Sequence, residues 1–511
     1  MISNEKKNMK WGVILSYFSM FVGLVGTLLV TNRVLDYIGD YNYGLYSFVN
    51  SITTWITVLS SALAASYLRF TSIEARDNDG DVSRTNSLYF KFLFLLGLIV
   101  LIIGLSVIGI MYINGMCIGH YSFEDSKLMY LLFVYSIINI SISLPASIFI
   151  LFINYKKKFI YEKSILVLTE ILKYLGHFLI AYYTRNILVI SIYTIITTVF
   201  TLSLNFMFCK IRLKMSFSKT YFKENKSLVQ SIIAFSSILI LNSIVDQINS
   251  NVDKTLLGFF SKPEDVTIYS LGQQFNTYLG ASSIAISSVF APKIHELCAK
   301  DEKEEVNSLF LKVSRLQALF VCIIAFGFVS CGRDFVLWWV GPARQDAYFV
   351  GIVLMFLSIM PLSVKLSIEV QRAYNKHKFR SYLYLIVSIL NIAISILFLI
   401  LLPIEYSIYA CLIGTVISSL ICHWIGINIY NDKVIGLPMK KHYIQLLKYI
   451  FLSLLSVSFV MFLKYYIIEN LDSYLLKVII EGFSFVFVFG LLMLIFDFKY
   501  LKRILKAIKK S

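Results

Sequence analysis

The chain has 511 residues, of which 58% are apolar and 15% charged, and its mean hydropathy is +0.74. This composition excludes a soluble globular protein and is typical of a polytopic membrane protein. The net charge of +17 leaves two classes of partner open, nucleic acid and the anionic face of a membrane. The seven cysteines form no CxxC pair and no histidine cluster has metal-ligand spacing, so we expect neither a metal site nor a cofactor.

Apolar runs follow one another along almost the whole chain. Each is close to the roughly 20 residues that a helix needs to cross the hydrocarbon core of a bilayer. The sequence therefore predicts an all-α membrane protein with about 14 transmembrane helices. The predicted spans are residues 11–35, 44–68, 89–112, 127–153, 161–183, 186–208, 229–260, 267–291, 310–331, 348–371, 381–402, 405–430, 446–467 and 474–497.

The distribution of charge between the loops predicts the orientation. With the N-terminus in the cytoplasm, the inner loops and tails hold most of the 47 Lys and Arg residues, as the positive-inside rule requires. Both termini are then cytoplasmic. The basic excess is explained by the inner membrane face, so we expect anionic membrane lipids as partners and no nucleic acid.

A short connector occurs twice, as YIGDYNYGLYSF at residues 37–48 and as FFSKPEDVTIYSL at residues 259–271. Arg33 aligns with Lys254 and Tyr46 with Tyr269. Six spans separate the copies, so both have the same orientation, as in transporters with parallel repeats. We therefore predict two pseudo-symmetric six-helix bundles around a central cavity, followed by two additional helices and a basic tail. The predicted domains are residues 1–228, 229–430 and 446–511.

The seventh span carries a polar stripe in an apolar helix. Its polar residues are spaced at steps of 4, 3 and 4, which places them on one helix face. Ionisable groups in a bilayer cost at least about 2.5 kcal/mol each and normally face a cavity or a partner helix. We interpret the stripe as the lining of a water-filled passage with a role in ion coupling, although hydrogen bonding between helices would give the same pattern. The residues are Asn242, Asp246, Asn249 and Asp253.

Three cations lie within or at the edge of predicted spans. Arg33 and its repeat mate Lys254 suit a diphosphate, because confined positive charge holds phosphate oxygens strongly. Both side chains also suit snorkelling to the outer interface. Lys365 follows Pro361, which can kink the helix, and is a third candidate for the diphosphate. Glu369, four residues later, is a candidate for cavity lining or ion coupling, or for a local ion pair with Lys365.

Uncharged amides in two spans are candidates for binding sugar hydroxyls, although most such amides in membrane helices serve helix packing. These candidates are Asn50, Gln273, Gln274 and Asn276.

Other polar residues in the spans have simpler interpretations. Glu170, Lys173 and His177 share one face of the fifth span, either as a packing triad or as a proton relay. Glu481 stands alone in the last span and is able to pair across helices. The tryptophans at 338 and 339 suit an aromatic belt at the interface.

No sequence motif for catalysis occurs. The chain has no nucleophile elbow, no phosphate-binding loop and no large outer loop to carry chemistry. We therefore expect a protein that is not an enzyme.

Several short motifs together resemble the Wzx-type polysaccharide flippases of the multidrug/oligosaccharidyl-lipid/polysaccharide exporter superfamily. The start of their first half is similar to Arg33 with YGLY at residues 43–46, and their outer loop is similar to WWVGP at residues 338–342. The start of their second half resembles DK at 253–254, LGF at 257–259, ED at 264–265 and IYSL at 268–271. Thr267 departs from the glycine that is usual in that second connector.

The resemblance implies a flippase that moves an undecaprenyl-diphosphate-linked oligosaccharide repeat unit across the bacterial inner membrane by alternating access. The product would serve capsule, O-antigen or exopolysaccharide assembly, with enzymes of that assembly as further partners. Coupling would be to an H⁺ or Na⁺ gradient or to the membrane potential. Alternatives are an ion-coupled multidrug antiporter of the same fold, a flippase for a peptidoglycan precursor, and a membrane polysaccharide polymerase or ligase.

Overall fold

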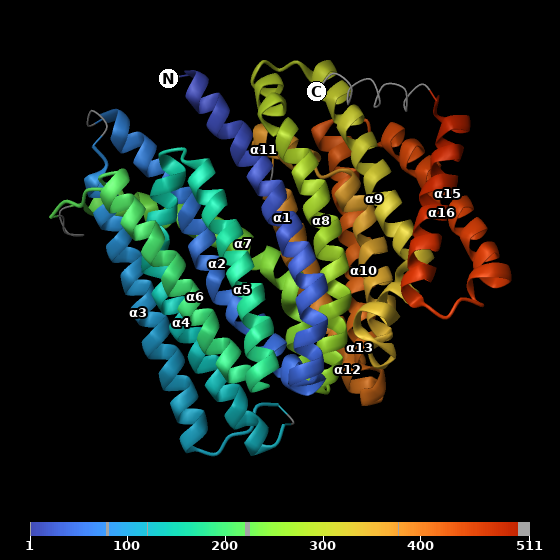
Figure 1. Ribbon diagram of the computed structural model, residues 1–511. Coiled ribbons are helices and arrows are strands. Elements are labelled where there is room, and N and C mark those ends of the chain that lie inside the picture. The colour runs from blue at the N-terminus through green and yellow to red at the C-terminus, as the bar shows by residue number, and fades with distance from the viewer. Residues whose placement is uncertain (1, 78–80, 120, 220–224, 377, 499–511) are drawn as a thin grey trace. The chain divides into compact units, whose positions relative to one another are not determined.

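The computed structural model describes residues 2–77, 81–119, 121–219, 225–376 and 378–498, and these ranges contain helices but no strand (Figure 1). The chain forms two compact units, Met1–Thr267 and Ile268–Ser511. The helices of the first unit are α1 (Ile2–Ile38), α2 (Asp40–Asp77), α3 (Ser83–Ile113), α4 (Phe123–Tyr155), α5 (Phe159–Thr184), α6 (Ile187–Met207), η1 (Phe208–Arg212) and α7 (Lys226–Phe260).

The second unit begins within α8 (Pro263–Ala299). Its remaining helices are α9 (Lys303–Val340), η2 (Pro342–Arg344), α10 (Asp346–Ser363), α11 (Ser367–Ala373), α12 (Lys378–Leu401), η3 (Ile404–Tyr406), α13 (Ser407–Ser419), η4 (Leu420–Gly426), α14 (Ile427–Tyr430), η5 (Asn431–Ile435), α15 (Met439–Leu463), η6 (Lys464–Ile468) and α16 (Tyr474–Phe496).

The fourteen predicted spans all lie on helices or on runs of consecutive helical segments. Among the described residues, eleven helical stretches are long and apolar enough to cross a membrane, so the chain is a multi-pass membrane protein. The helices α2, α7 and α8 are not among these eleven. They are the helices on which the sequence places the polar stripe and the amides.

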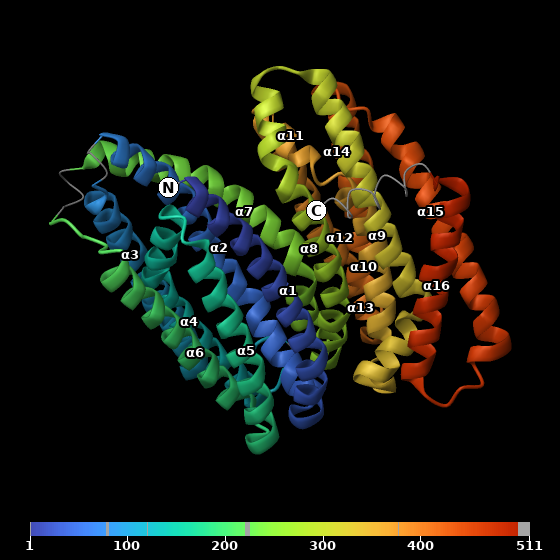
Figure 2. The ribbon, with the colours of Figure 1, turned by 45° about the horizontal axis from the view of Figure 1, so that its top comes forward.

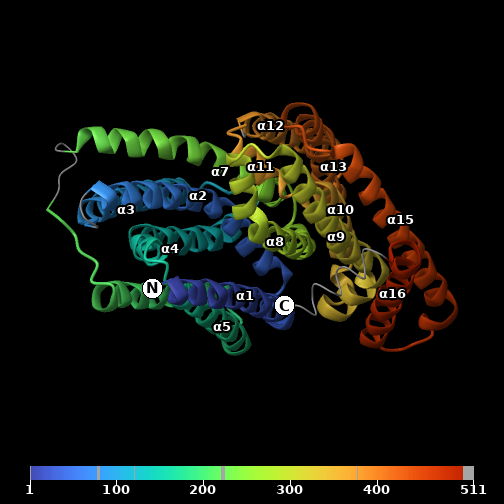
Figure 3. The ribbon, with the colours of Figure 1, turned by 90° about the horizontal axis from the view of Figure 1, so that it is seen from above.

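The first unit is organised around α2. This helix packs against α7 on one side and α4 on another, while α1 packs along α5 (Figure 3). The compact units divide after Thr267, because α7 packs along α2. The predicted bounds of the two bundles, with the second beginning at residue 229, stay predictions. The pseudo-symmetric arrangement of the two bundles stays a prediction.

The second unit is built on α9, which contacts α10, α15 and α16 (Figure 2). Its core holds fully buried aromatic side chains such as Phe310, Phe326 and Phe485. Trp339 belongs to this packing, with its ring centroid 5.7 Å from that of Phe275, while Trp338 is exposed. The interpretation of both tryptophans as interface residues is therefore wrong for Trp339.

The two copies of the repeated connector lie against each other in the first unit. Gly39, with φ of +79°, ends α1, and the chain turns into α2. A Cβ on Gly44 would lie 1.9 Å from the Pro263 carbonyl oxygen, so only glycine fits there. Thr267, the residue aligned with Gly44, donates its hydroxyl to the Asp40 carbonyl at 2.7 Å. Threonine in place of glycine thus adds a hydrogen bond between the connectors.

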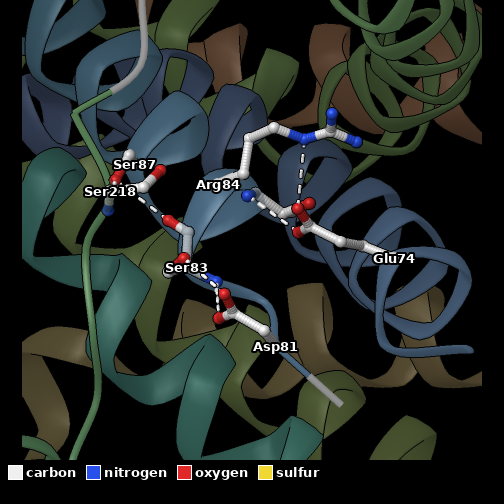
Figure 4. A network of polar contacts seen from close by, with 7 residues as sticks. Glu74, Asp81, Ser83, Arg84, Ser87 and Ser218 are labelled. Atoms are coloured by element: carbon white, nitrogen blue, oxygen red, sulfur yellow. Dashed lines mark hydrogen bonds and ion pairs between the residues drawn. The ribbon is translucent and has the colours of Figure 1, made fainter. Parts of the chain in front are cut away.

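A network of polar contacts joins α2 to the start of α3 (Figure 4). The buried Glu74 carboxylate accepts the Thr85 backbone N–H at 2.8 Å and the Arg84 Nε at 3.1 Å, so it satisfies a free donor of the α3 N-terminus. The Ser218 backbone N–H donates to Ser87 Oγ at 2.8 Å. The segment that follows α6 is therefore held against the same end of the unit.

Candidate functional site

A polar cavity of ≈ 150 Å³ lies inside the first unit, between α2, α4 and α6. This volume is well above the roughly 10–15 Å³ that one water molecule needs. Nearly all of its lining residues carry a hydroxyl or an amide. They are Tyr46, Asn50, Thr53, Thr54 and Thr57 on α2, Tyr135, Ser136, Asn139 and Ile140 on α4, and Ser191 and Thr194 on α6.

The α2 wall results from helical periodicity, because residues three and four apart share a face. Thr53 donates its hydroxyl proton to the Val49 carbonyl at 3.0 Å, and Thr54 donates to the Asn50 carbonyl at 2.8 Å. Hydroxyls used in this way keep their oxygen lone pairs available as acceptors. The α2 wall therefore offers acceptors from its threonines and an amide donor from Asn50.

The α6 wall is oriented by a contact from α5. Thr194 donates its hydroxyl to the Ile190 carbonyl at 3.0 Å, so it accepts from His177 Nε2, which lies 3.2 Å away. His177 thus orients the Thr194 hydroxyl, and its triad with Glu170 and Lys173 stays a prediction. On α4, the Asn139 Oδ1 atom is buried without a hydrogen-bond partner among the described residues. An unpaired buried acceptor of this kind favours a polar ligand or water.

The lining of the cavity has no formal charge at neutral pH among its described residues. A surface of hydroxyls and amides matches the hydroxyl groups of a sugar, which both donate and accept hydrogen bonds. It matches a cationic drug poorly, because no carboxylate of the lining is present to compensate a desolvated positive charge. Among the described residues, no three His, Cys, Asp or Glu side chains come together as a metal site.

Of the four amides predicted to bind sugar, Asn50 lines this cavity. The other three lie on α8, in the part that belongs to the second unit, and do not line it. Gln274 Oε1 and Asn276 Oδ1 are buried without a partner among the described residues. For Gln273, Gln274 and Asn276, contact with sugar stays a prediction.

The cations Arg33 and Lys254 both belong to the first unit. Arg33 is exposed on α1, and Lys254 is half-buried on α7 next to the buried Asp253. The following residue, Thr255, shares a hydrogen bond of 2.9 Å with Ser51 of α2. Three members of the polar stripe have side chains outside the described part of α7. These are Asn242, Asp246 and Asn249.

The third predicted cation, Lys365, lies in the second unit at a break between α10 and α11. The break follows Pro361, as the sequence predicts, and interrupts the regular spacing of residues on a single helix face. Glu369 lies on α11, forms an ion pair with Arg372 at 2.7 Å and is hydrogen-bonded to His295 of α8 at 3.3 Å. Glu369 therefore joins α8 to α11.

Sequence reasoning missed the α4 and α6 walls of the cavity. The signal was present in YSIINIS at residues 135–141, where Ser136 and Asn139 are three residues apart in an otherwise apolar helix. A polar residue at this spacing is more often part of helix packing, so only the opposing wall on α2 distinguishes the two roles.

Comparisons with known proteins agree on family and fold. The chain matches the family described as "Polysaccharide biosynthesis protein" over residues 38–348. No curated protein sequence matches it. Its fold is similar to that of a lipid II flippase, MurJ, in an inward closed conformation, with a TM-score of 0.67 at 16% identity over 96% of this chain and 99% of that one.

Transporters of the MOP superfamily have the same fold. An inward-facing multidrug resistance MATE family transporter gives a TM-score of 0.64 at 12% identity, over 82% of this chain and 98% of that one. An outward-facing one gives 0.58 at 11% identity, over 83% and 95%. The family match covers more than half of the 511 residues. The chain is a member of the polysaccharide biosynthesis protein family with the MurJ- and MATE-like fold of the MOP superfamily.

Proposed function

We propose that the protein is a flippase that carries an undecaprenyl-diphosphate-linked oligosaccharide repeat unit across the bacterial inner membrane, with both termini in the cytoplasm. The polysaccharide would serve capsule, O-antigen or exopolysaccharide assembly. An H⁺ or Na⁺ gradient or the membrane potential drives the cycle. The uncharged, hydroxyl-rich cavity between α2, α4 and α6 carries the proposal, in a chain whose family serves polysaccharide biosynthesis.

In this proposal the cavity binds one sugar ring of the repeat unit. The amides of Asn50 and Asn139 donate to sugar oxygens, and the Thr194 hydroxyl accepts from a sugar hydroxyl. The diphosphate interacts with Arg33 and Lys254, the two cations of the same unit that the repeat aligns. A charged Arg or Lys side chain donates strong hydrogen bonds to phosphate oxygens where water is scarce.

An ion-coupled multidrug antiporter is the second candidate, because MATE transporters share the fold. Such a protein needs carboxylates at its site for a cationic drug, and the described lining of this cavity has none. The proposal therefore favours a neutral polyhydroxyl head group over a cation.

The test measures movement of an undecaprenyl-diphosphate oligosaccharide in proteoliposomes, detected by a membrane-impermeant lectin. Thr194→Val keeps the side-chain volume and removes the hydroxyl, and we expect transport to fall about two- to tenfold, the value of one hydrogen bond. The matched control is Ser203→Ala on the same helix. Ser203 is exposed and its hydroxyl donates only to the Val199 carbonyl, so its loss is expected to leave transport unchanged.

The possible results of these experiments distinguish the parts of the proposal from one another. Equal rates for Thr194→Val and the wild type would reject the cavity as the sugar site. Unchanged transport in both Arg33→Gln and Lys254→Met would reject the diphosphate assignment without affecting the cavity. Efflux of cationic dyes by a protein that does not move the lipid-linked sugar would favour the antiporter.

A further inference from the structure

A buried cluster of three charged side chains lies in the second unit, whereas the cavity belongs to the first. The Lys464 ammonium contacts the Asp334 carboxylate, and its Nζ lies 2.9 Å from Glu481 Oε1. The three residues come from η6, α9 and α16. Glu481 has no exposed surface, and Asp334 is only 5% exposed. The Glu481 that stands alone in the sequence is therefore one of two acids at a single cation.

The formal charges of this cluster do not cancel. Two ionised carboxylates and one ammonium leave a net charge of −1, and both carboxylates are buried. Buried charge without compensation is unfavourable, and two carboxylates that share a site do not both ionise readily. No further cation forms an ion pair with either acid among the described residues.

The second observation is an oxygen without a partner. Glu481 Oε2 is buried and accepts no hydrogen bond from any described residue, and Oε1 has only its ion-pair contact with Lys464 Nζ, which does not have hydrogen-bond geometry. A buried carboxylate oxygen is normally hydrogen-bonded, whereas a protonated carboxyl turns one oxygen into a donor and places it beside a neighbouring acceptor. The nearby titratable groups are Cys331 of α9, which donates to the Gly327 carbonyl, and Tyr348 of α10, which donates to the Val329 carbonyl. The nearby cation Arg333, next to Asp334 on α9, is exposed and forms no ion pair with either acid in the described part of the chain.

We propose that Asp334, Lys464 and Glu481 form a proton-binding site, in which Glu481 carries one proton and Asp334 stays ionised. The proton makes the cluster neutral, as a Lys464–Asp334 ion pair beside an uncharged carboxylic acid. Two members of the site, Lys464 and Glu481, lie on the helices that follow the two predicted bundles, and Asp334 lies on α9. It is independent of the sugar cavity, and its ligand is H⁺.

The position of the site gives the proton a short route to one side of the membrane. Asp334 is six residues from the end of α9 at Val340, and Glu481 is seven residues from the start of α16 at Tyr474. At about 1.5 Å per residue, both lie roughly 10 Å from those helix ends. In the predicted orientation these ends face the outside. Loss of the proton leaves a buried net charge of −1 where α15 and α16 pack on α9, so we expect this packing to weaken as the pH rises.

Infrared spectroscopy of the purified full-length protein tests the site through the C=O stretching band of a protonated carboxyl. The difference spectrum between the wild type and Glu481→Gln at neutral pH is expected to contain this band. Asp334→Asn is expected to remove the same band, because Glu481 then ionises as the single counter-ion of Lys464. Persistence of the band in either variant would overturn the proposal.

If a variant fails to fold, the wild type alone still tests the site. Its melting temperature and its infrared spectrum are then measured as a function of pH. The wild type should lose the band and melt at a lower temperature as the pH rises, with both changes at the same pH. Glu481→Gln carries a permanently neutral amide and should melt without this change. A wild type that has no carboxylic acid band at any pH at which it is folded would refute the site.

Discussion

Gly44 lies at a position where the fold leaves no room for a Cβ atom. A Cβ at this position would lie 1.9 Å from the carbonyl oxygen of Pro263, which is backbone and cannot rotate away. We expect Gly44→Ala to lower the free energy of unfolding by about 1–3 kcal/mol, as overpacking does. Thermal unfolding in detergent measures the change.

Gly109→Ala is the matched control for that substitution. Gly109 also lies inside a helix, α3, but a Cβ there would meet no atom within 4 Å. Alanine is the better helix former by about 1 kcal/mol, so Gly109→Ala should leave the melting temperature equal or higher. If both variants melted like the wild type, the close contact of the two connectors would be wrong.

The distance along the sequence between a residue and its contacts explains why some predictions from sequence succeeded and others did not. The interruption of the helix shortly after Pro361 was indicated by the local sequence, whereas the need for glycine at position 44 comes from the distant Pro263 carbonyl. The partners of Glu481 lie 17 residues away at Lys464 and 147 residues away at Asp334, so no periodicity indicates them. Trp339 was misjudged for the same reason, because its contact with Phe275 is non-local.

At the scale of elements, the helix pair α15 and α16 is fastened to α9 at both ends. The proton-binding site lies at one end. At the other, Asp497 follows α16 and pairs with Arg315 of α9 at 2.5 Å and with Lys448 of α15 at 3.3 Å. Tyr449 is 3.2 Å from the same carboxylate oxygen. One carboxylate therefore joins three helices.

The Asp497 carboxylate makes this fastening dependent on pH. Burial alone would raise the pKa of Asp497, but the Arg315 guanidinium and the Lys448 ammonium outweigh burial and hold this pKa below its usual value. A depressed pKa contributes stability above the unfolded value of about 3.9, and this contribution is lost as the pH falls below it. Asp497→Asn should cost about 1.5–3 kcal/mol at neutral pH, the value of charged hydrogen bonds.

Thermal unfolding at neutral pH and at low pH checks the expectation. The melting temperatures of the wild type and of Asp497→Asn should differ at neutral pH and converge in acid. Glu296→Gln is the control, because Glu296 also pairs with two cations, Lys293 and Lys300, but on an exposed surface where such pairs contribute roughly 0–1 kcal/mol. An equal loss in both variants would show that burial is unimportant at Asp497.

The positions of the helices were predictable from the sequence, but only part of the cavity lining was. Every predicted span lies on a helix or on a run of consecutive helical segments, because the cost of unpaired backbone in lipid leaves the chain few alternatives. The cavity needs three helices whose polar faces meet, and only Asn50 was identified among its lining residues. The hydroxyls of α4 and α6 look like ordinary packing residues until the neighbours of each helix are known. A single sequence does not state which helices are neighbours.

At the scale of the whole molecule, every functional proposal assumes the same orientation of the chain in the membrane. Positive charge in the predicted inner loops predicts that both termini are cytoplasmic and that the loop between α3 and α4 lies outside. That loop contains Cys117, which is exposed, whereas five of the other cysteines are buried and Cys331 is partly covered. The chain thus carries a native reporter of its topology.

Intact cells treated with a membrane-impermeant maleimide should therefore label the wild type at Cys117, and Cys117→Ser should lose most of the label. In that background Lys158→Cys places a thiol at an exposed position between α4 and α5, on the predicted inner side. It should react only after the membrane is permeabilised. The opposite result, with Cys117 protected and position 158 labelled in intact cells, would invert the molecule. The positive loops would then face outward, and sugar would enter the cavity from the other side.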